Sequence, residues 1–527
     1  MNSAAEIKDL PQYFDFDVTA NLDKPIDLPV TGSLPAWVTG SLYRVGNGVY
    51  KLGDRAWCHV FDGLALLHRW TIHEGKVTYL STILDSNNYK KCVKYHRLVG
   101  VNFGASFPDP CRTIFNSLFS HFLPRAKSDN TAVHFVEGAD KLFALTETTV
   151  INEVNPATLK KVAEVDMKDY LAVHMGTAHA HIDTDGSLYY YATHFGLSSG
   201  YDFVRIPKSV SGEVQFNKAE ILGRVNSRWR MHLSYTHSFG MSENYLVHFE
   251  QPLTYNLAKL TSLELRGISV IDAMVEFKDE PINIIVVSKT TGQKVPITYR
   301  APHGFVFHFI NCYEDGGFIV CDVCLYKNAS VIKELYLEAL SAQPHNTVSL
   351  PHFARFVLPV DVEKAALNTN LVTLTYTTAT AIVMKHSKNS ALVDLTSDPV
   401  FEESCLIELP RMNYSWNARR YRYFYASTAL ATHTRKIYKC DVQEKTTREY
   451  ICDEHHIPGE PVFVSRPDAT DEDDGVVLCP ILAGTTDHSS YLLVLDAQSF
   501  EELARATVPP QLKMNFSFHG RFVNKVF

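Results

Sequence analysis

Long apolar runs, an excess of basic residues and a dense set of cysteines are all missing from this chain of 527 residues. No run of 18 apolar residues occurs, so the sequence predicts no membrane-spanning helix. Lysine and arginine number 50 against 58 aspartate and glutamate residues, a formal net charge of −8. This balance argues against nucleic acid as a main partner.

The cysteines are few and scattered. Ten of them lie between Cys58 and Cys479 with no dense framework, so we expect free thiols in a reducing compartment. The opening `MNSAAEIKDLPQYFDFD` has neither the apolar core of a secretory signal nor the arginines of a transit peptide. The sequence therefore predicts a cytoplasmic protein.

One CxxC motif, Cys321 and Cys324 in `FIVCDVCLY`, is a candidate metal or redox site. The run is rich in β-branched and apolar residues and is predicted to be a strand. Residues three apart on a strand face opposite sides, so the two sulfurs are not expected to share a metal.

Short apolar runs bounded by Gly, Asn, Asp or Pro fill most of the chain and are typical of an all-β protein. Helical patterns are scarce, with candidates in `PDPCRTIFNSLFSHFL` and `VIKELYLEALSA`, and no linker divides residues 1–527 into domains. A β chain of this length must protect its strand edges, which radial repetition into a propeller does. The predicted strands lie in `GKVTYLSTIL`, `KLFALTETTVINEVNP`, `GSLYYYATHFG`, `NYLVHFEQPL`, `GGFIVCDVCLY`, `NLVTLTYTTATAIVM`, `RYRYFYAST`, `DGVVLCPIL` and `SYLLVLDAQS`.

Four histidines stand in similar settings near predicted strand ends: His179, His237, His308 and His519. They are separated by 58, 71 and 211 residues, which fits seven blades of roughly 60 to 70 residues, each histidine pointing to a central axis. Such a cluster could bind a metal. Two alternatives remain open at this point: a local pair formed by His179 and His181, and ordinary hydrogen-bonded core histidines.

Several long motifs, in order along the chain, resemble those of the carotenoid cleavage oxygenases. The resemblance runs from about residue 32 to 522, and it is closer to the animal β-carotene oxygenases than to the retinoid isomerohydrolase. The departures from the family pattern are Ala180, where proline is usual, and `VGNG`, where `NGPG` is usual. The motifs include `CHVFDGLALLHRW`, `FGASFPDPCRTIF`, `LTETTVINEVNPATL`, `HSFGMSENYLVHFEQPL`, `IELPRMNYSWNARRYRYFYA` and `EPVFVSRPDATDEDDGVVL`.

The resemblance implies a single seven-bladed β-propeller with a helical and loop cap over its top face. It also implies an Fe(II) ion on the axis. His181 is then a hydrogen-bonded neighbour of the first ligand and His174 is structural. By motif, the iron ligands are His179, His237, His308 and His519. Three glutamates hold three of these histidines: Glu147 holds His237, Glu408 holds His308 and Glu460 holds His519. His179 has no such partner.

The implied activity is oxidative cleavage of a carotenoid with dioxygen, at the central bond of β-carotene to give retinal. Phe103, Tyr235 and Tyr326 are expected to line the substrate tunnel, and Thr146, Tyr235 and Tyr326 to act near the reacting atoms. Tyr326 favours the β-carotene oxygenases, since the isomerohydrolase has tryptophan there. Eccentric cleavage, combined cleavage and isomerisation, retinyl ester isomerohydrolysis and carotenoid binding without chemistry remain alternatives.

A carotenoid-cleaving enzyme must reach a membrane, and residues 108–127 are the best candidate for that contact. Their apolar residues form one stripe on a helix, with Arg112 and Arg125 close by, a pattern typical of an interfacial helix. A cap helix packed on the propeller is the alternative. The predicted contacts, which make the protein peripherally membrane-associated, are Cys111 (a candidate palmitoylation site), Ile114, Phe115, Leu118, Phe119 and Phe122.

Overall fold

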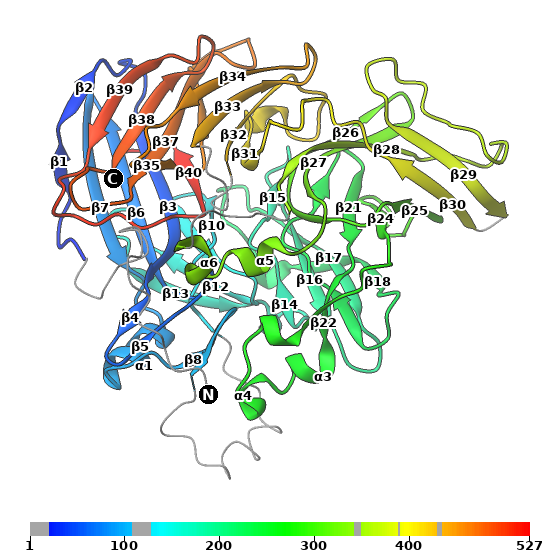
Figure 1. The fold of residues 1–527 in the computed structure, drawn as a ribbon, viewed down its shortest axis with the longest axis horizontal. Helices are drawn as coiled ribbons and strands as arrows, with labels where there is room; N and C mark the ends of the chain where they lie inside the picture. Colours follow the sequence, from blue (N-terminus) through cyan, green and yellow to red (C-terminus); the bar gives the residue numbers. More distant parts are fainter. Residues whose placement is uncertain (1–20, 108–127, 342–348, 388–389, 429–434) are drawn as a thin grey trace.

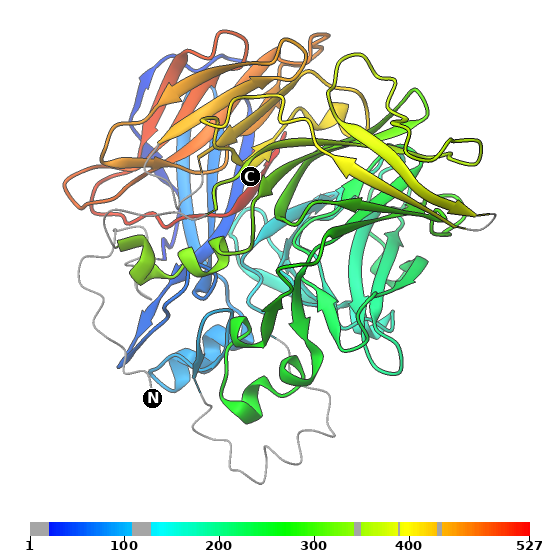
Figure 2. The same ribbon diagram turned by 45° about the vertical axis from the view of Figure 1, so that its right-hand side comes forward.

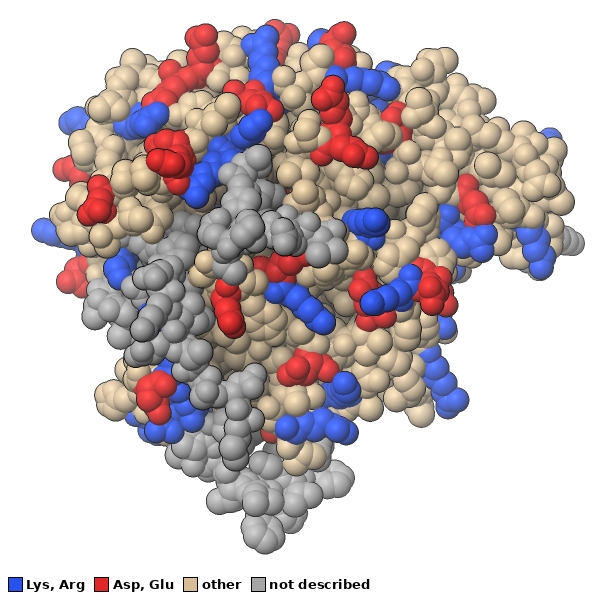
Figure 3. Space-filling view, viewed as in Figure 1, with Lys and Arg blue, Asp and Glu red and all other residues tan. Residues whose placement is uncertain are grey.

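The computed structural model of the protein describes residues 21–107, 128–341, 349–387, 390–428 and 435–527. Strands dominate these residues, which confirms the all-β prediction. Seven sheets of three to six strands are arranged around a central axis as the blades of a propeller (Figure 1). Acidic and basic side chains are interspersed over the face shown in Figure 3.

The ring of blades closes where the two ends of the chain meet. The strand β40 (His519–Val523) pairs with β3 (Gly40–Val49) in the first sheet, and β2 (Val30–Gly32) pairs with β39 (Glu502–Thr507) in the last. Each end therefore completes a sheet built by the other end, which leaves fewer unpaired strand edges. The pairing also places His519 opposite Val45.

The first three sheets follow one another in chain order, apart from β40. The first sheet holds β1 (Ile26–Leu28), β7 (Lys76–Ile83), β6 (Leu64–His73), β3 and β40. The second sheet holds β10 (His134–Gly138), β11 (Lys141–Leu145), β12 (Val150–Val154) and β13 (Lys161–Asp166). The third sheet holds β14 (Met175–Gly176), β15 (His181–Ile182), β16 (Leu188–His194), β17 (Gly200–Ile206) and β18 (Glu220–Asn226).

The other four sheets complete the ring. The fourth sheet holds β20 (Gly240–Met241), β21 (Tyr245–Glu250), β24 (Ile282–Ser288), β25 (Ile297–Ala301), β30 (Ser390–Thr396) and β29 (Thr380–Ser387), and the fifth holds β26 (Phe305–Asp315), β27 (Phe318–Tyr326) and β28 (His352–Pro359). The sixth sheet holds β31 (Glu408–Arg411), β32 (Tyr423–Ser427), β33 (Lys436–Asp441) and β34 (Thr446–Ile451). The seventh holds β2, β39, β38 (Tyr491–Asp496), β37 (Gly475–Ala483), β36 (Val462–Ser465) and β35 (His456–Pro458).

Burial along a strand depends on its place in the blade. All ten residues of β3 are buried, because the strand lies inside its sheet and both of its faces pack on neighbouring blades. On the outer strand β34 no residue is fully buried, since one of its faces meets solvent. On the inner strand β3, the buried guanidinium of Arg44 has buried partners in Glu460 and Ser517.

Shorter elements form a cap on one side of the ring, seen at the lower end of Figures 1 and 2. Backbone hydrogen bonds from Val270 and Ile271 to the carbonyls of Asn102 and Phe103 join its parts. The cap comprises β4 (Lys51–Leu52), β5 (Arg55–Ala56), α1 (Asn87–Lys94), β8 (Gly100–Val101), β9 (Ser106–Phe107), β19 (His232–Ser234), β22 (Leu253–Asn256), α3 (Leu257–Leu260), α4 (Leu263–Arg266), η4 (Ile271–Ala273), β23 (Met274–Glu276), α5 (Val331–Glu334) and α6 (Leu337–Ser341).

The predicted helix in `VIKELYLEALSA` is confirmed, as the pair α5 and α6, whereas α1 was not predicted. Residues 108–127, the other predicted helix, lie outside the described residues. Single 3-10 turns occur elsewhere, at η2 (Met167–Asp169), η3 (Phe216–Lys218) and η5 (Tyr414–Trp416).

One strand prediction is wrong in part. The run 370–384 was expected to be a continuous strand, but only its last residues belong to β29, and residues 371–379 are irregular. The side-chain oxygen of Asn370 accepts hydrogen bonds from the backbone N–H groups of Val372 and Ala381. These local bonds replace a strand ladder there.

The strand predicted at the CxxC motif is confirmed as β27. Cys321 and Cys324 lie on opposite faces of β27, and each packs into a different apolar cluster. The nine cysteines within the described residues are all free thiols.

Candidate metal centre

The four predicted histidines come together at the centre of the ring, each from a different blade. Their nearest ring nitrogens all lie within 4.8 Å of one another. Nε2 of His179 is 2.9 Å from Nε2 of His237, and Nε2 of His308 is 3.3 Å from Nε2 of His519. Residues that are up to 340 positions apart in the sequence thus converge on one point.

Three carboxylates hold three of these rings from behind. Nδ1 of His237 donates to Glu147 at 2.5 Å, Nδ1 of His308 to Glu408 at 2.5 Å and Nδ1 of His519 to Glu460 at 2.8 Å. The structure therefore brings together the three pairs that the resemblance implies, and among the described residues no carboxylate contacts His179. A carboxylate on Nδ1 fixes the tautomer and directs the Nε2 lone pair toward the centre.

The three glutamates differ in their second partner. Glu147 accepts a hydrogen bond from the hydroxyl of Tyr235 at 2.9 Å, and Glu408 one from Tyr326 at 3.1 Å. Glu460, only 1 % exposed, instead accepts from the buried guanidinium of Arg44 at 2.8 Å and from the backbone N–H of Gly520 at 2.9 Å. Two carboxylates thus face neutral donors, and the third faces a cation.

Local sequence explains how these side chains reach the axis. Glu147 lies in the turn that follows β11, and Glu408 is the first residue of β31, where the ladder with β32 is irregular. Glu460 lies between β35 and β36. Breaks in strand pairing release side chains from strict alternation and let them point along the axis.

Burial lowers the pKa of three of the imidazoles, those of His179, His237 and His519. It lowers the pKa of His179 and of His519 well below the usual value, and the neighbouring histidines lower both further. The pKa of His237 is also lowered by burial, against the opposing effect of Glu147. Burial raises the pKa of Tyr235 and of Tyr326 well above 10, so both hydroxyls stay protonated and donate.

This donor set fits a metal cation. The Nδ1–H groups of His308 and His519 are used by carboxylates, so their Nε2 atoms, 3.3 Å apart, face each other with lone pairs. Two buried lone pairs repel each other unless a cation lies between them. Neutral imidazole nitrogens are good ligands for iron, and also for zinc, copper and nickel.

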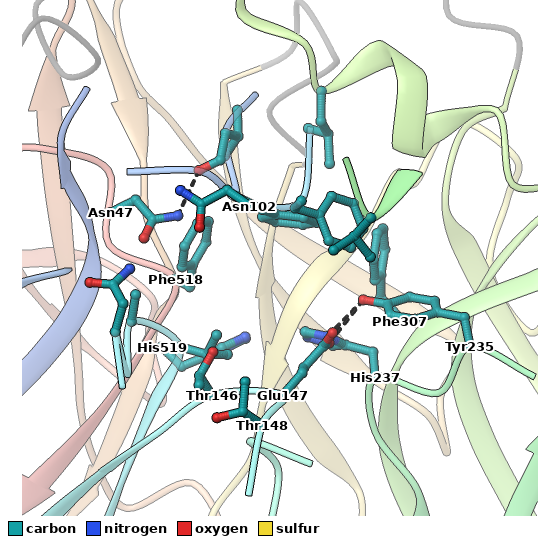
Figure 4. A pocket seen from close by; sticks show the side chains of 18 of the residues that line it. Asn47, Asn102, Thr146, Glu147, Thr148, Tyr235, His237, Phe307, Phe518 and His519 are labelled. Carbon is teal, nitrogen blue, oxygen red and sulfur yellow. Dashed lines mark hydrogen bonds and ion pairs between the residues drawn. The ribbon is translucent and has the colours of Figure 1, made fainter. Parts of the chain in front are cut away.

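An apolar cavity of about 260 Å³ lies on one side of the histidines (Figure 4). Phe103, Tyr235 and Tyr326 all line it, as expected of tunnel residues, and Thr146 lines it beside Glu147. The Tyr235 ring stacks on Phe305 with centroids 6.1 Å apart. Because Tyr235 and Tyr326 also hydrogen-bond the glutamates, the cavity wall is tied directly to the histidine cluster.

Sequence reasoning missed three residues of the site. Phe307 and Phe518 line the cavity beside His308 and His519, and the ring of Phe307 stands edge-on to His237 at 5.4 Å. The irregular ladder between β26 and β27 lets Phe307 and His308 both reach the axis. Arg44 could have been noticed as a lone charge in the apolar run `SLYRVG`.

The remaining predicted residues either lie outside the histidine cluster or fall outside the described residues. The Nε2 of His181 bonds the carbonyl of Phe239 at 2.8 Å, and His174 stacks on Phe195, so neither joins the cluster. No helix within the described residues is long and apolar enough to cross a bilayer. The predicted membrane contacts lie outside the described residues: Cys111, Ile114, Phe115, Leu118, Phe119 and Phe122.

Comparisons with known proteins place this arrangement in one family. Residues 15–524 match the family model described as retinal pigment epithelial membrane protein. The β,β-carotene 15,15'-dioxygenase of Rattus norvegicus is 35% identical over 516 residues, covering 95% of this chain and 89% of the relative. The carotenoid-cleaving dioxygenase, mitochondrial, of Mustela putorius furo is 36% identical over 513 residues, covering 94% of each.

Solved structures agree on the fold. A variant of the Synechocystis apocarotenoid oxygenase superposes with a TM-score of 0.77 at 22% identity, covering 98% of both chains. A cobalt-substituted form of that oxygenase superposes equally well at 21% identity. Because the family model and the relatives both span nearly the whole chain, this protein belongs to the retinal pigment epithelial membrane protein family of carotenoid oxygenases that its motifs resemble.

Proposed function

We propose that this chain is a non-haem Fe(II) dioxygenase that cleaves β-carotene at its central double bond and produces retinal. Relatives at 34 to 35% identity from rat, mouse, human and chicken carry the name β,β-carotene 15,15'-dioxygenase. The observation that carries the proposal is the junction of a four-imidazole cluster with an aromatic-lined apolar cavity.

His179, His237, His308 and His519 would hold the iron through Nε2. When bound, Fe(II) supplies the activation of dioxygen that oxidative cleavage requires. Glu147, Glu408 and Glu460 keep the Nδ1 proton on three of the rings, so each Nε2 stays an acceptor. The three carboxylates also place negative charge around a cation, which offsets its desolvation.

The cavity residues act on the polyene. Rings of Phe103, Tyr235, Phe307 and Tyr326 surround the space beside the histidines and exclude water from it. Positive charge that develops along a conjugated chain is stabilised by aromatic faces, by about 0.5–2 kcal/mol for each well-placed ring. The side chain of Thr146 lines the same space and limits how closely a substrate approaches the histidines.

A second candidate function is cleavage of β-carotene at a double bond other than the central one. The identity to the ferret carotenoid-cleaving dioxygenase is 36%, close to the 35% identity to the rat β,β-carotene 15,15'-dioxygenase. The scissile bond depends on how deeply the polyene enters the cavity.

We also propose peripheral contact with a membrane through residues 108–127, supported by their amphipathic sequence pattern. Flotation of the protein with phosphatidylcholine vesicles tests this proposal. Replacing Phe115 and Phe119 by Ser should release the protein from the vesicles, and unchanged flotation of that variant would contradict it.

The enzymatic proposal is tested by anaerobic purification, metal analysis and incubation with β-carotene in detergent and air. We expect about one iron per chain and retinal as the sole product, read by chromatography and mass spectrometry. Apocarotenal with ionone would favour the second candidate, and intact β-carotene would overturn both. His237→Ala should lose iron and activity, whereas the exposed His386→Ala is the matched control.

A further inference from the structure

A second cavity, of about 100 Å³, lies against the histidine cluster. His308 and His519 line both cavities, while His179 lines only this one. The wall of the second cavity mixes apolar side chains with polar ones, and the polar ones include Arg411 and Arg521. It lies beside η5 and Tyr414, whose side chain is 39% exposed, so solvent can reach this region.

The arginines near this cavity share few carboxylates. Arg44 and Arg411 both pair with Glu460 and Arg521 pairs with Glu137, whereas Glu408 is held by His308 and makes no ion pair with an arginine among the described residues. Glu460 is already engaged by Arg44, by the ring of His519 and by the backbone of Gly520. Its negative charge is therefore largely satisfied before Arg411, 3.5 Å away, is counted.

Several donors at this cavity have no partner among the described residues. Arg411 makes one long ion pair to Glu460 and no hydrogen bond, and the buried Nε of Arg521 has no partner while its Nη2 donates to Glu137. His134, only 8% exposed, stacks on His179 and has an unpartnered Nδ1. A buried polar group without a partner costs about 1–3 kcal/mol, so such a group is a good ligand contact.

We propose that this cavity binds a small planar oxyanion, of the size of formate or bicarbonate, between the guanidinium groups of Arg411 and Arg521. A guanidinium presents paired N–H donors that match the two oxygens of such an anion. The volume of about 100 Å³ suits an anion of a few atoms. The hydroxyl of Tyr414 is already occupied by the backbone N–H of Ile182 and by His181, so the arginines are the main contacts.

The site would also balance the charge of the metal centre. His179 is the one imidazole of the cluster that no carboxylate contacts, and it faces this cavity. An anion held by the two arginines places negative charge on that side. This inference does not depend on which carotenoid bond is cleaved, because it concerns a cavity separate from the aromatic one.

The test is the NMR line width of isotope-labelled formate in the presence of the metal-loaded protein. The wild type should broaden the formate signal, and Arg411→Gln/Arg521→Gln should bind formate about tenfold more weakly, the loss expected for about 1.4 kcal/mol of charge-assisted hydrogen bonding. The matched control is Arg300→Gln/Arg466→Gln, which removes two exposed arginines from ion pairs with aspartates. It should broaden formate as the wild type does.

Equal broadening by the wild type and the Arg411/Arg521 variant would place formate elsewhere, including on the metal, and would overturn the proposal. If the wild type does not broaden the formate signal, the proposal is overturned as well. If the glutamine variant does not fold, Arg411→Lys/Arg521→Lys replaces it, since lysine keeps the charge and loses the paired donors. That variant should still bind formate several-fold more weakly than the wild type.

Discussion

The hydroxyl of Tyr235 donates a hydrogen bond to the carboxylate of Glu147 at 2.9 Å. The same carboxylate oxygen accepts the Nδ1–H of His237, so a residue of the cavity wall contacts a metal-orienting group directly. Tyr326 and His308 likewise both bond the carboxylate of Glu408, through its two different oxygens. Each tyrosine thus lines the cavity with its ring and holds a glutamate with its hydroxyl.

Tyr235→Phe keeps the ring but removes the hydrogen bond to Glu147. We expect metal affinity to fall about tenfold, the lower end of the effect of losing a group that orients a metal ligand. The measurement is a competition titration with a metal chelator. The control is Tyr255→Phe, since within the described residues the Tyr255 hydroxyl makes no hydrogen bond although its ring lines the same cavity. Equal affinity in the two variants would contradict the coupling.

Replacing Glu460 should destabilise the fold more than replacing Glu408. Glu460→Gln leaves the guanidinium of Arg44 buried beside a neutral amide, and losing one partner of a buried ion pair costs about 3–5 kcal/mol. Glu408→Gln leaves only neutral partners, namely the hydroxyl of Tyr326, the ring of His308 and the backbone N–H of Leu409, so we expect a loss of about 1–2 kcal/mol. Urea unfolding of the metal-free proteins measures both. Both variants should lose metal affinity, and an equal loss of stability would contradict the role assigned to Arg44.

Asp62 makes stability depend on pH. Burial raises its pKa from 3.8 to about 7, against the lowering effect of the backbone N–H of Gly104 and its neighbours. A carboxyl group with a raised pKa binds its proton more tightly in the folded state, so it destabilises the fold as pH rises from about 4 to about 7. Asp62→Asn removes the titration and keeps an oxygen to accept from Gly104, whose loop carries Phe103.

The stability of Asp62→Asn relative to wild type should therefore increase between pH 5 and pH 8, by roughly 2–4 kcal/mol. Unfolding in urea at a series of pH values measures it. The exposed Asp471→Asn serves as the control and should follow the wild-type curve. A constant difference between Asp62→Asn and wild type over this range would show that Asp62 does not titrate as described.

Sequence patterns were sufficient for most of the predicted strands, because alternation and turn residues are local signals. They also singled out the four histidines, although the residues alone left a local His179 and His181 pair open until the family motifs were considered. The partnership of Arg44 with Glu460 could not be predicted, since it joins the two ends of the chain through the closure of β3 with β40. The irregular residues 371–379 were misassigned because threonine favours strands, while the bonds of Asn370 that prevent one depend on its side-chain geometry.

Phe307 is the cavity residue whose role is easiest to isolate. Its ring contacts Phe305, His237 and Tyr326 and hydrogen-bonds none of them, so its loss removes an aromatic face without disturbing a carboxylate. Phe307→Leu should slow β-carotene cleavage about tenfold, the effect of losing one ring beside a developing cation, while iron content stays at the wild-type level. The control is Phe318→Leu, a buried phenylalanine in the cluster between β27 and β32, which gives the stability cost of the change alone. Iron content is read by metal analysis and the rate by retinal formation under saturating oxygen. If Phe307→Leu cleaves at the wild-type rate, the ring serves only to fill space, and the stabilisation of the polyene must come from Tyr235 and Tyr326.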